Sequence, residues 1–324
     1  MPSICNKKGD TGLNSIWTMG EMIVEIMRPR ADMPLDVAGE FWGPYPSGAP
    51  AIFADTVAKM GKNAGIIGGV GKDDFGKCLM EHLHAHGVNC EFVEEIEGCS
   101  TGAAFVTYFS SGERKYIFHI GNTPAAMAKS PNISSIENPA FFHLMGCSLT
   151  ANDVFYDEIL KTLYKFMDKG AKISFDPNLR PELIGKRSMT EFIGPILENC
   201  SVLMPGEEEL LNITKSTRVE QGLEKLFRNP KLEIVALKKG SKGCTIYSRQ
   251  EQFDLGIYPV VQKDATGAGD SFDAAFLCAL VDELPLKECA KIASAAAALN
   301  TAAFGPMEGQ ISPKSVADMV RSNK

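Results

Sequence analysis

The sequence predicts an α/β fold built around a mainly parallel sheet. Short apolar runs, each the length of one strand, alternate with segments of helical apolar spacing along most of the 324 residues. This alternation is typical of βαβ units, in which ligand chemistry gathers at the carboxyl ends of the strands. The chain is 44% apolar, which is enough to build a large core.

Apolar spacing and end signals place the regular elements of the body. Gly61 and Gly87 each follow a helical pattern, and glycine is favoured there because it adopts the left-handed conformation that ends a helix. The expected elements are a first strand at Ser15–Ile26, helices at Ala49–Met60 and Asp74–His86, and strands at Ala64–Ile67, Phe141–Leu144, Lys172–Phe175, Ser201–Met204 and Ile234–Leu237.

Two segments depart from this alternation. Gly102–Phe109 and Lys115–Ile120 are strand-like, have no helix after them and are joined by Ser-Ser-Gly-Glu, which predicts a β-hairpin. With the Pro- and Gly-rich Arg28–Gly48, this hairpin is expected to form a small sheet. The small sheet suits an active-site lid, and the alternative is an ordinary surface hairpin. We therefore expect a single domain over residues 1–324, with a lid formed by about residues 27–48 and 101–123.

Composition limits the classes of partner. Lys and Arg total 33 against 40 Asp and Glu, a net charge of -7 that gives little support for a nucleic-acid or membrane-binding surface. The nine cysteines are scattered without a CxxC pair, as is typical of reduced thiols. The first sixteen residues lack the apolar core of a signal peptide, and no segment has the ~18 consecutive apolar residues of a membrane span. We expect a cytoplasmic protein that holds anions with local donors.

The segment richest in chemistry is Asp264-Ala-Thr-Gly-Ala-Gly-Asp270, which a helical pattern follows. Small residues ahead of a helix let backbone N–H groups point at one locus, where the helix dipole adds positive charge. Asp270 would lie in the first turn, where the dipole is expected to keep it ionised. A carboxylate beside an anion hole suits phosphoryl transfer, because it can accept the proton of a substrate hydroxyl. The alternative is a plain helix N-cap with a tight turn.

Ordered segments along nearly the whole chain resemble the PfkB/ribokinase family of ATP-dependent carbohydrate kinases. Asp264–Asp270 resembles the family's signature, and Ser47–Ala54 followed by Gly68–Gly76 looks like its amino-terminal signature. Asp176-Pro-Asn-Leu-Arg180 is similar to a segment of fructokinase-like and 2-keto-3-deoxygluconate kinase-like members. The resemblance implies a ribokinase-like three-layer α/β/α fold with a mostly parallel sheet and a small β-sheet lid.

The resemblance also implies catalytic and cation-binding roles. In many members, the first and third positions of the signature help to bind a monovalent cation, so a potassium ion is expected, and a structural turn is the alternative. The implied residues are Asp270 as catalytic base, the amides of Gly267, Ala268 and Gly269 as anion hole, and Asp264 and Thr266 at the cation.

Val235–Gly243 resembles the family's nucleotide-phosphate segment. Lys238 replaces a frequent Thr there, and its ammonium group would neutralise phosphate; the alternative is a solvated basic turn. The alanine-rich Ala293–Asn300 and the turn Phe304–Pro306 match the adenine-lining segment, with Ser294 where many members have Asn. The implied nucleotide-binding residues are Lys238, Gly240, Gly243, Ser294 and Gly305.

An acidic helix start follows the strand at Ser201–Met204. In the family this position often reads Asn-x-x-Glu and supports a network of magnesium, water and phosphate. Glu209 matches the Glu, whereas Gly206 replaces the Asn. The alternative is that acids in a first helical turn simply complement the helix dipole. We expect ATP to bind with Mg²⁺, which Glu209 holds through water.

The sugar end departs from the family pattern. Ile52 stands where an Asn usually contacts sugar hydroxyls, and Glu25 stands where a sugar-binding Asp often lies. Arg180 carries a fork that suits phosphate or carboxylate, although a salt-bridged Asx-Pro turn is the alternative for its segment. The implied substrate-binding residues are Glu25, Gly48, Ala49, Ile52, Asp176, Asn178 and Arg180.

Two other motifs are set aside. Gly68–Lys72 is not a Walker loop, because Ile66 occupies the first Gly position and Asp73 follows the Lys. His82-x-His84-x-His86 invites a metal site, but on a helix the middle His points away from the outer two. Basic groups also suit the carboxyl end of a helix. This pattern predicts a solvated helix end.

The sequence therefore predicts an ATP-dependent, magnesium-requiring kinase acting on a primary hydroxyl of a small sugar or sugar acid, a ketose or 2-keto-3-deoxy acid being favoured. A nucleoside or phosphosugar kinase on the same scaffold is one alternative. A non-catalytic sugar-binding relative is the other, suggested by Ile52 and Gly206 at normally polar positions. The resemblance also implies a homodimer formed through the lid.

Overall fold

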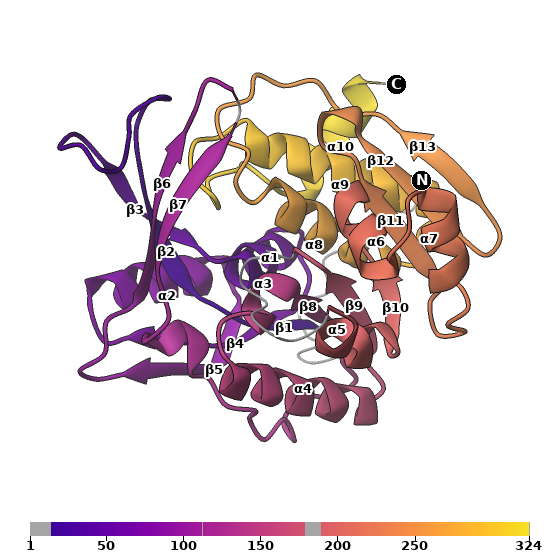
Figure 1. Cartoon of the computed structure of the whole chain (residues 1–324), viewed down its shortest axis with the longest axis horizontal. Coiled ribbons are helices and arrows are strands. Elements are labelled where there is room, and N and C mark those ends of the chain that lie inside the picture. The colour runs from indigo at the N-terminus through magenta and orange to yellow at the C-terminus, as the bar shows by residue number, and fades with distance from the viewer. Residues whose placement is uncertain (1–13, 112, 179–188, 324) are drawn as a thin grey trace.

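The computed structural model describes residues 14–111, 113–178 and 189–323, and Figure 1 shows their strands gathered into two sheets. From β5 to β11 in spatial order, the strands of the larger sheet pair in parallel, and the hairpin of β12 and β13 extends one edge antiparallel. Across this sheet the order is β13 (Gln252–Leu255), β12 (Cys244–Ser248), β11 (Ile234–Lys238), β10 (Cys200–Leu203), β9 (Lys172–Asp176), β8 (Phe141–Met145), β1 (Ile16–Met19), β4 (Ala64–Gly71) and β5 (Asn89–Ile96).

Helices cover both faces of the large sheet. Successive strand residues point to opposite faces, and both faces are apolar: Ile66 packs into one core cluster and Ile67 into the other. This arrangement confirms the predicted α/β/α layering. One side carries α1 (Ala49–Lys59), α2 (Asp74–His86), α8 (Ala268–Val281), α9 (Leu286–Thr301) and, packed on α9, α10 (Pro313–Ser322); the other carries α4 (Asp153–Asp168), α5 (Met189–Leu197), α6 (Glu207–Thr214) and α7 (Val219–Leu226).

The smaller sheet stands at one side of the molecule, on the left in Figure 1. It has the order β3 (Trp42–Ser47), β2 (Ile23–Met27), β6 (Gly102–Tyr108) and β7 (Arg114–His119). The predicted hairpin is present as β6 and β7, and the Pro- and Gly-rich segment supplies β3. Sequence reasoning therefore located this sheet, although β2 was not expected in it.

The prediction of one strand over Ser15–Ile26 is wrong, because the chain changes sheets in the middle of this apolar run. β1 ends at Met19, and β2 begins at Ile23 and pairs with β3 and β6. Gly20 lies at the change of direction, packed so closely that a Cβ there would be 2.2 Å from Ser148 Oγ. The break depends on this tertiary contact, which apolar periodicity does not report.

Helix α2 has the predicted bounds. Asp73 accepts the N–H of Gly76 at 2.8 Å as N-cap, and Gly87 ends the helix with φ 83. His84 and His86 are exposed, as predicted for a solvated helix end, but His82 is half-buried. His82 and His86 both contact Asp55 of α1, which is 1% exposed and which the sequence did not predict as their partner. No helix in the described part of the chain combines the length and apolar character needed to cross a bilayer.

Candidate active site

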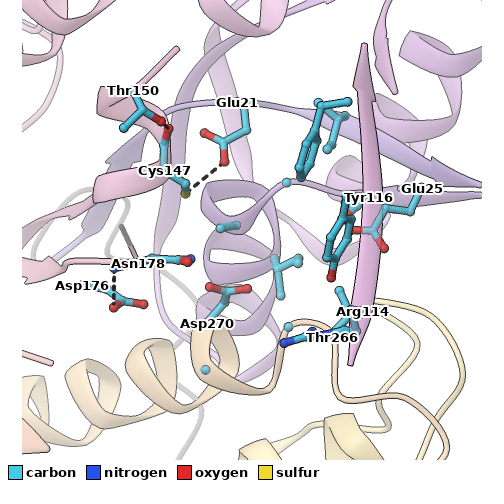
Figure 2. Close-up of a pocket in the computed structure, with 18 of the residues that line it drawn as sticks. Glu21, Glu25, Arg114, Tyr116, Cys147, Thr150, Asp176, Asn178, Thr266 and Asp270 are labelled. Atoms are coloured by element: carbon cyan, nitrogen blue, oxygen red, sulfur yellow. Dashed lines mark hydrogen bonds between the residues drawn. The ribbon is translucent and has the colours of Figure 1, made fainter. Parts of the chain in front are cut away.

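A cavity of about 590 Å³ lies between the two sheets. It opens over the carboxyl ends of the parallel strands, where Asp176 ends β9 and Lys238 ends β11, and the small sheet contributes its side wall (Figure 2). Thirteen of the predicted site residues line it: Glu25, Gly48, Ala49, Ile52, Asp176, Asn178, Glu209, Lys238, Gly240, Thr266, Gly267, Gly269 and Asp270.

The glycine-rich loop meets the cavity at the start of α8. Gly267 is the helix N-cap with φ 76, and a Cβ there would lie 2.7 Å from the carbonyl oxygen of Pro306. Only glycine fits both the left-handed backbone and this contact. The Ala268 N–H donates to Ala265 O at 3.4 Å, whereas Gly269 lines the cavity at the start of the helix, where the first N–H groups have no acceptor within the helix.

Asp270 lies in the first turn of α8 and is 8% exposed. In Figure 2 its carboxyl group faces the centre of the cavity, across from Glu21. Burial and the negative charge of Asp176 raise the pKa of Asp270 to about 8, against the lowering by Lys238. Burial and Asp176 therefore oppose the helix dipole, which was expected to keep Asp270 ionised.

Lys238 lies beside the glycine loop and between two buried carboxylates. Its Nζ is 2.9 Å from Asp176 Oδ2 and 3.0 Å from Asp273 Oδ2, and a Cβ on Gly269 would be 3.7 Å from the same Nζ. Burial acts to lower the pKa of Lys238, but the charges of Asp176 and Asp273 outweigh it and raise the pKa. The side chain is thus a fixed cation next to the predicted anion hole, not a solvated basic turn.

Ile52, which stands where the family pattern usually has Asn, packs against the glycine-rich loop. Its Cγ2 would be 3.0 Å from a Cβ on Gly267, so Ile52 packs beneath the glycine loop as part of the cavity floor. Gly48, with φ 104, precedes α1, and a Cβ there would lie 2.4 Å from the carbonyl oxygen of Glu21. Glu25 Oε1 accepts a hydrogen bond from Ser47 Oγ at 2.7 Å on the small-sheet side.

Asp264 is held by three donors. Thr266 N–H donates to Oδ1 at 2.8 Å, Gly305 N–H donates to Oδ2 at 3.0 Å, and the hydroxyl of Tyr108, from β6, also donates to Oδ1. Tyr108 also contacts Thr266 Oγ1 at 2.5 Å. A carboxylate offers about four acceptor positions, so Asp264 retains room for one ligand bond to a cation.

Glu209 and Gly206 form the start of α6 at the cavity wall. Glu209 Oε2 accepts the Gly206 N–H at 2.7 Å, so this carboxylate caps its own helix while it lines the cavity. This capping contact fits the predicted dipole-favoured role of an acid in a first helical turn.

The remaining predicted site residues either do not line the cavity or lie outside the described residues. Gly243 turns the chain with φ 88 where a Cβ would lie 2.0 Å from Leu255 O, and Ser294 is buried near Cys244. Arg180 lies outside the described residues. Ala268, Asp264 and Gly305 support the loop without lining the cavity themselves.

Sequence reasoning missed several wall residues. Cys147, which follows β8, donates to Glu21 Oε1 at 3.1 Å, and Ser148 donates to Glu21 Oε2 at 2.5 Å. Burial and Glu21 raise the pKa of the Cys147 thiol, which therefore stays protonated. The end of the strand at Phe141–Leu144 was the available signal, because side chains that follow parallel strands meet at this edge. The missed residues with side-chain polar groups or rings are Glu21, Ser47, Arg114, Tyr116, Phe118, Cys147 and Thr150.

The sequence pattern of the pfkB family carbohydrate kinases matches residues 15–313. The chain belongs to this family. "Probable fructokinase-4" of Arabidopsis thaliana is 30% identical over 319 residues, which cover 95% of this chain and 97% of that protein. "Fructokinase-1" of Zea mays is 31% identical over 306 residues, 91% of this chain and 94% of that one.

Solved structures agree with this assignment. The apo form of a "putative Ribokinase II" from E. coli is 34% identical with a TM-score of 0.90, covering 96% of this chain and 100% of that chain. The form with ATP and Mg²⁺ is 33% identical with a TM-score of 0.88 and the same coverage. The predicted family, ribokinase-like fold and carbohydrate kinase activity are confirmed.

Proposed function

We propose that this kinase transfers the γ-phosphoryl group of ATP to a primary hydroxyl of a small ketose, with Asp270 as the base. The observation that carries the proposal is the placement of Asp270. It is a buried carboxyl group at a helix N-terminus, next to glycine amides and a fixed lysine, that faces a cavity of about 590 Å³. Phosphoryl transfer needs these parts together, because its catalysis is mostly positioning and charge stabilisation.

Each residue has a distinct part in the transfer. Asp270 orients the substrate hydroxyl and takes its proton as the oxygen attacks phosphorus. The amides of Gly267, Ala268 and Gly269 stabilise the charge that develops on the phosphoryl oxygens. Lys238, held by Asp176 and Asp273, adds a cation on the same side. Magnesium bound with ATP neutralises phosphate charge, and Glu209 would hold it through water.

The sugar is expected to bind against the small sheet. Glu25 and Tyr116 come from that sheet, and Glu21, Thr150 and Asn178 face them from the body (Figure 2). Such carboxylate, amide and hydroxyl groups suit hydroxyl recognition. The relatives named fructokinase favour a ketose, and the small sheet would act as the lid that excludes water.

A panel of acceptors tests the proposal. Wild-type protein with ATP and Mg²⁺ is assayed with fructose, 2-keto-3-deoxygluconate, ribose, a nucleoside and fructose 6-phosphate, with Asp270→Asn as the matched variant. We expect turnover of a free ketose and a loss of kcat of about 10²–10⁴-fold in the variant. Turnover confined to the nucleoside or the phosphosugar would remove the substrate assignment, and full activity of Asp270→Asn would remove the base.

We also propose a homodimer that meets through the small sheet. Support comes from large apolar side chains exposed there, with Ile117 42% and Trp42 44% exposed. Analytical ultracentrifugation of wild type and Ile117→Lys is the test. The variant is expected to sediment as a monomer, and a wild-type monomer at micromolar concentration would contradict the proposal.

A further inference from the structure

Outside the kinase cavity, one cluster of metal-ligating side chains joins α1 to α2. His82 and His86 lie one turn apart on α2, and Asp55 faces them from α1. The three side chains offer one ligand atom each, and these atoms lie within 4.8 Å of one another. It is the one group of this kind in residues 14–111, 113–178 and 189–323, and none of its members lines the cavity.

We propose that Asp55, His82 and His86 form a site for a divalent transition metal, with Zn²⁺ as the best match. Two imidazole nitrogens and a carboxylate oxygen, with a fourth position left for water, are a common zinc ligand set. A tetrahedral zinc with ligand bonds of about 2.0–2.1 Å separates its ligand atoms by about 3.3 Å. His82 Nε2 and Asp55 Oδ1 already lie 3.3 Å apart.

The second histidine requires one small adjustment. His86 Nδ1 lies 2.5 Å from Asp55 Oδ1, so a hydrogen bond with one proton joins these atoms. Zn²⁺ would take the place of this proton, which leaves to solvent, and the two atoms would separate by about 0.8 Å to the zinc spacing. His86 is the last residue of α2 and its side chain is 33% exposed, so it can move and the metal can enter from solvent.

The surroundings select the type of metal. Lys59 Nζ lies 2.8 Å from Asp55 Oδ2 and forms an ion pair with that oxygen, whereas Oδ1 faces the two histidines. The site therefore offers two nitrogens and one oxygen beside a fixed positive charge. Magnesium and calcium prefer sets of oxygen ligands, whereas zinc favours imidazole. The site should thus discriminate against the Mg²⁺ that accompanies ATP.

Metal binding would also connect two helices of the kinase body, α1 and α2. Asp55 lies one turn after Ile52 of the cavity floor. At the other end of α2, Asp73 accepts hydrogen bonds from Thr101, directly before the first residue of β6. A metal between α1 and α2 would therefore link the helix under the cavity to the helix that anchors the small sheet.

Titration of tag-free, full-length protein with Zn²⁺ against a chromophoric zinc chelator tests the site. We expect wild type to bind a single equivalent, and His82→Gln and His86→Gln each to bind at least about tenfold more weakly. His84→Gln is the matched control, because His84 lies on the same helix but faces solvent, and its affinity should equal that of wild type. Millimolar Mg²⁺ should not compete.

Absorption of the Co²⁺-loaded wild type provides a readout that needs no variant. Intense visible bands of tetrahedral Co²⁺ are expected, and they should disappear on addition of Zn²⁺. Absence of zinc binding, equal affinity of His86→Gln and wild type, or loss of binding in His84→Gln would each overturn the proposal. None of these outcomes bears on the sugar assignment, since the assays contain neither ATP nor sugar.

Discussion

Among single residues, the proposed base Asp270 gives the most direct test of the proposed function. Burial and Asp176 raise its pKa to about 8, and a general base must be ionised to accept a proton. We therefore predict that kcat/KM, which reports the free enzyme, rises with pH through about 8. Removing the Asp176 charge with Asp176→Asn should lower this pKa and move the rising limb to lower pH. An unchanged limb in the variant would contradict the assignment.

Gly267 allows a second test at the level of one residue. In Gly267→Ala the new Cβ would meet Pro306 O and the left-handed backbone would be strained, so the loop must shift away from the phosphoryl position. We expect kcat to fall about 10²–10³-fold, as for loss of an oxyanion donor. Gly256→Ala is the control, because a Cβ there meets no atom within 4 Å. Equal activity of both variants would argue against the anion hole.

Among the elements, a contact between β6 and the glycine-rich loop joins the small sheet to the start of α8. The Tyr108 hydroxyl reaches Asp264 and Thr266, which together precede α8. Tyr108→Phe removes this link and opens an acceptor position on Asp264. At about 1 kcal/mol for a lost hydrogen bond, we predict a rise of about fivefold in KM for the sugar.

The same variant tests the cation assignment. If Asp264 contributes to a potassium site, Tyr108→Phe should alter the KCl concentration that gives half-maximal activity. Tyr164→Phe on α4 is the matched control, because Tyr164 is 46% exposed and does not line the cavity. Identical KM values and KCl responses in the two variants would show that Tyr108 affects neither sugar binding nor the cation site.

Elements with local causes could be predicted from the sequence, whereas contacts between distant elements could not. Helix α2 was bounded correctly because its cap residues act on their own neighbours, and the loop before α8 was found because its glycines have a local cause. The partners of Lys238 were not predictable, since Asp273 lies 35 residues away and no periodicity relates them. Tyr108 is 156 residues from Asp264. Contacts between residues so distant in sequence depend on how the sheets are placed in space, and the apolar pattern of one sequence does not predict this placement.

For the whole molecule, His143 sets a limit on stability in acid. It is fully buried in β8, stacked on Phe53 with ring centroids 4.1 Å apart, and burial lowers its pKa to about 3. An unfolded His titrates near pH 6.5, so the unfolded state binds more protons below that pH. Folding stability should therefore fall as pH drops from about 6.5 toward 3, by about 1.4 kcal/mol per pH unit from this residue.

Chemical denaturation at pH 7 and pH 5 measures this effect. Replacement of His143 by Gln, which does not titrate, should lower stability at pH 7 but flatten the loss between the two pH values. His84→Gln, which alters an exposed His, should leave the wild-type slope unchanged. A slope in His143→Gln equal to that of wild type would show that other groups cause the acid sensitivity.

The passage of the chain between the two sheets determines how the molecule can change shape. Gly20, Glu21 and Met22 link β1 to β2, and Gly48 links β3 to α1. Glu21 and Gly48 are also part of the cavity wall. Two of the connections between the sheets thus lie in the cavity wall, so a change in the angle between the sheets would also change the shape of the cavity. A sugar bound against Glu21 would therefore restrict the angle between the two sheets directly, through the segment that connects β1 to β2.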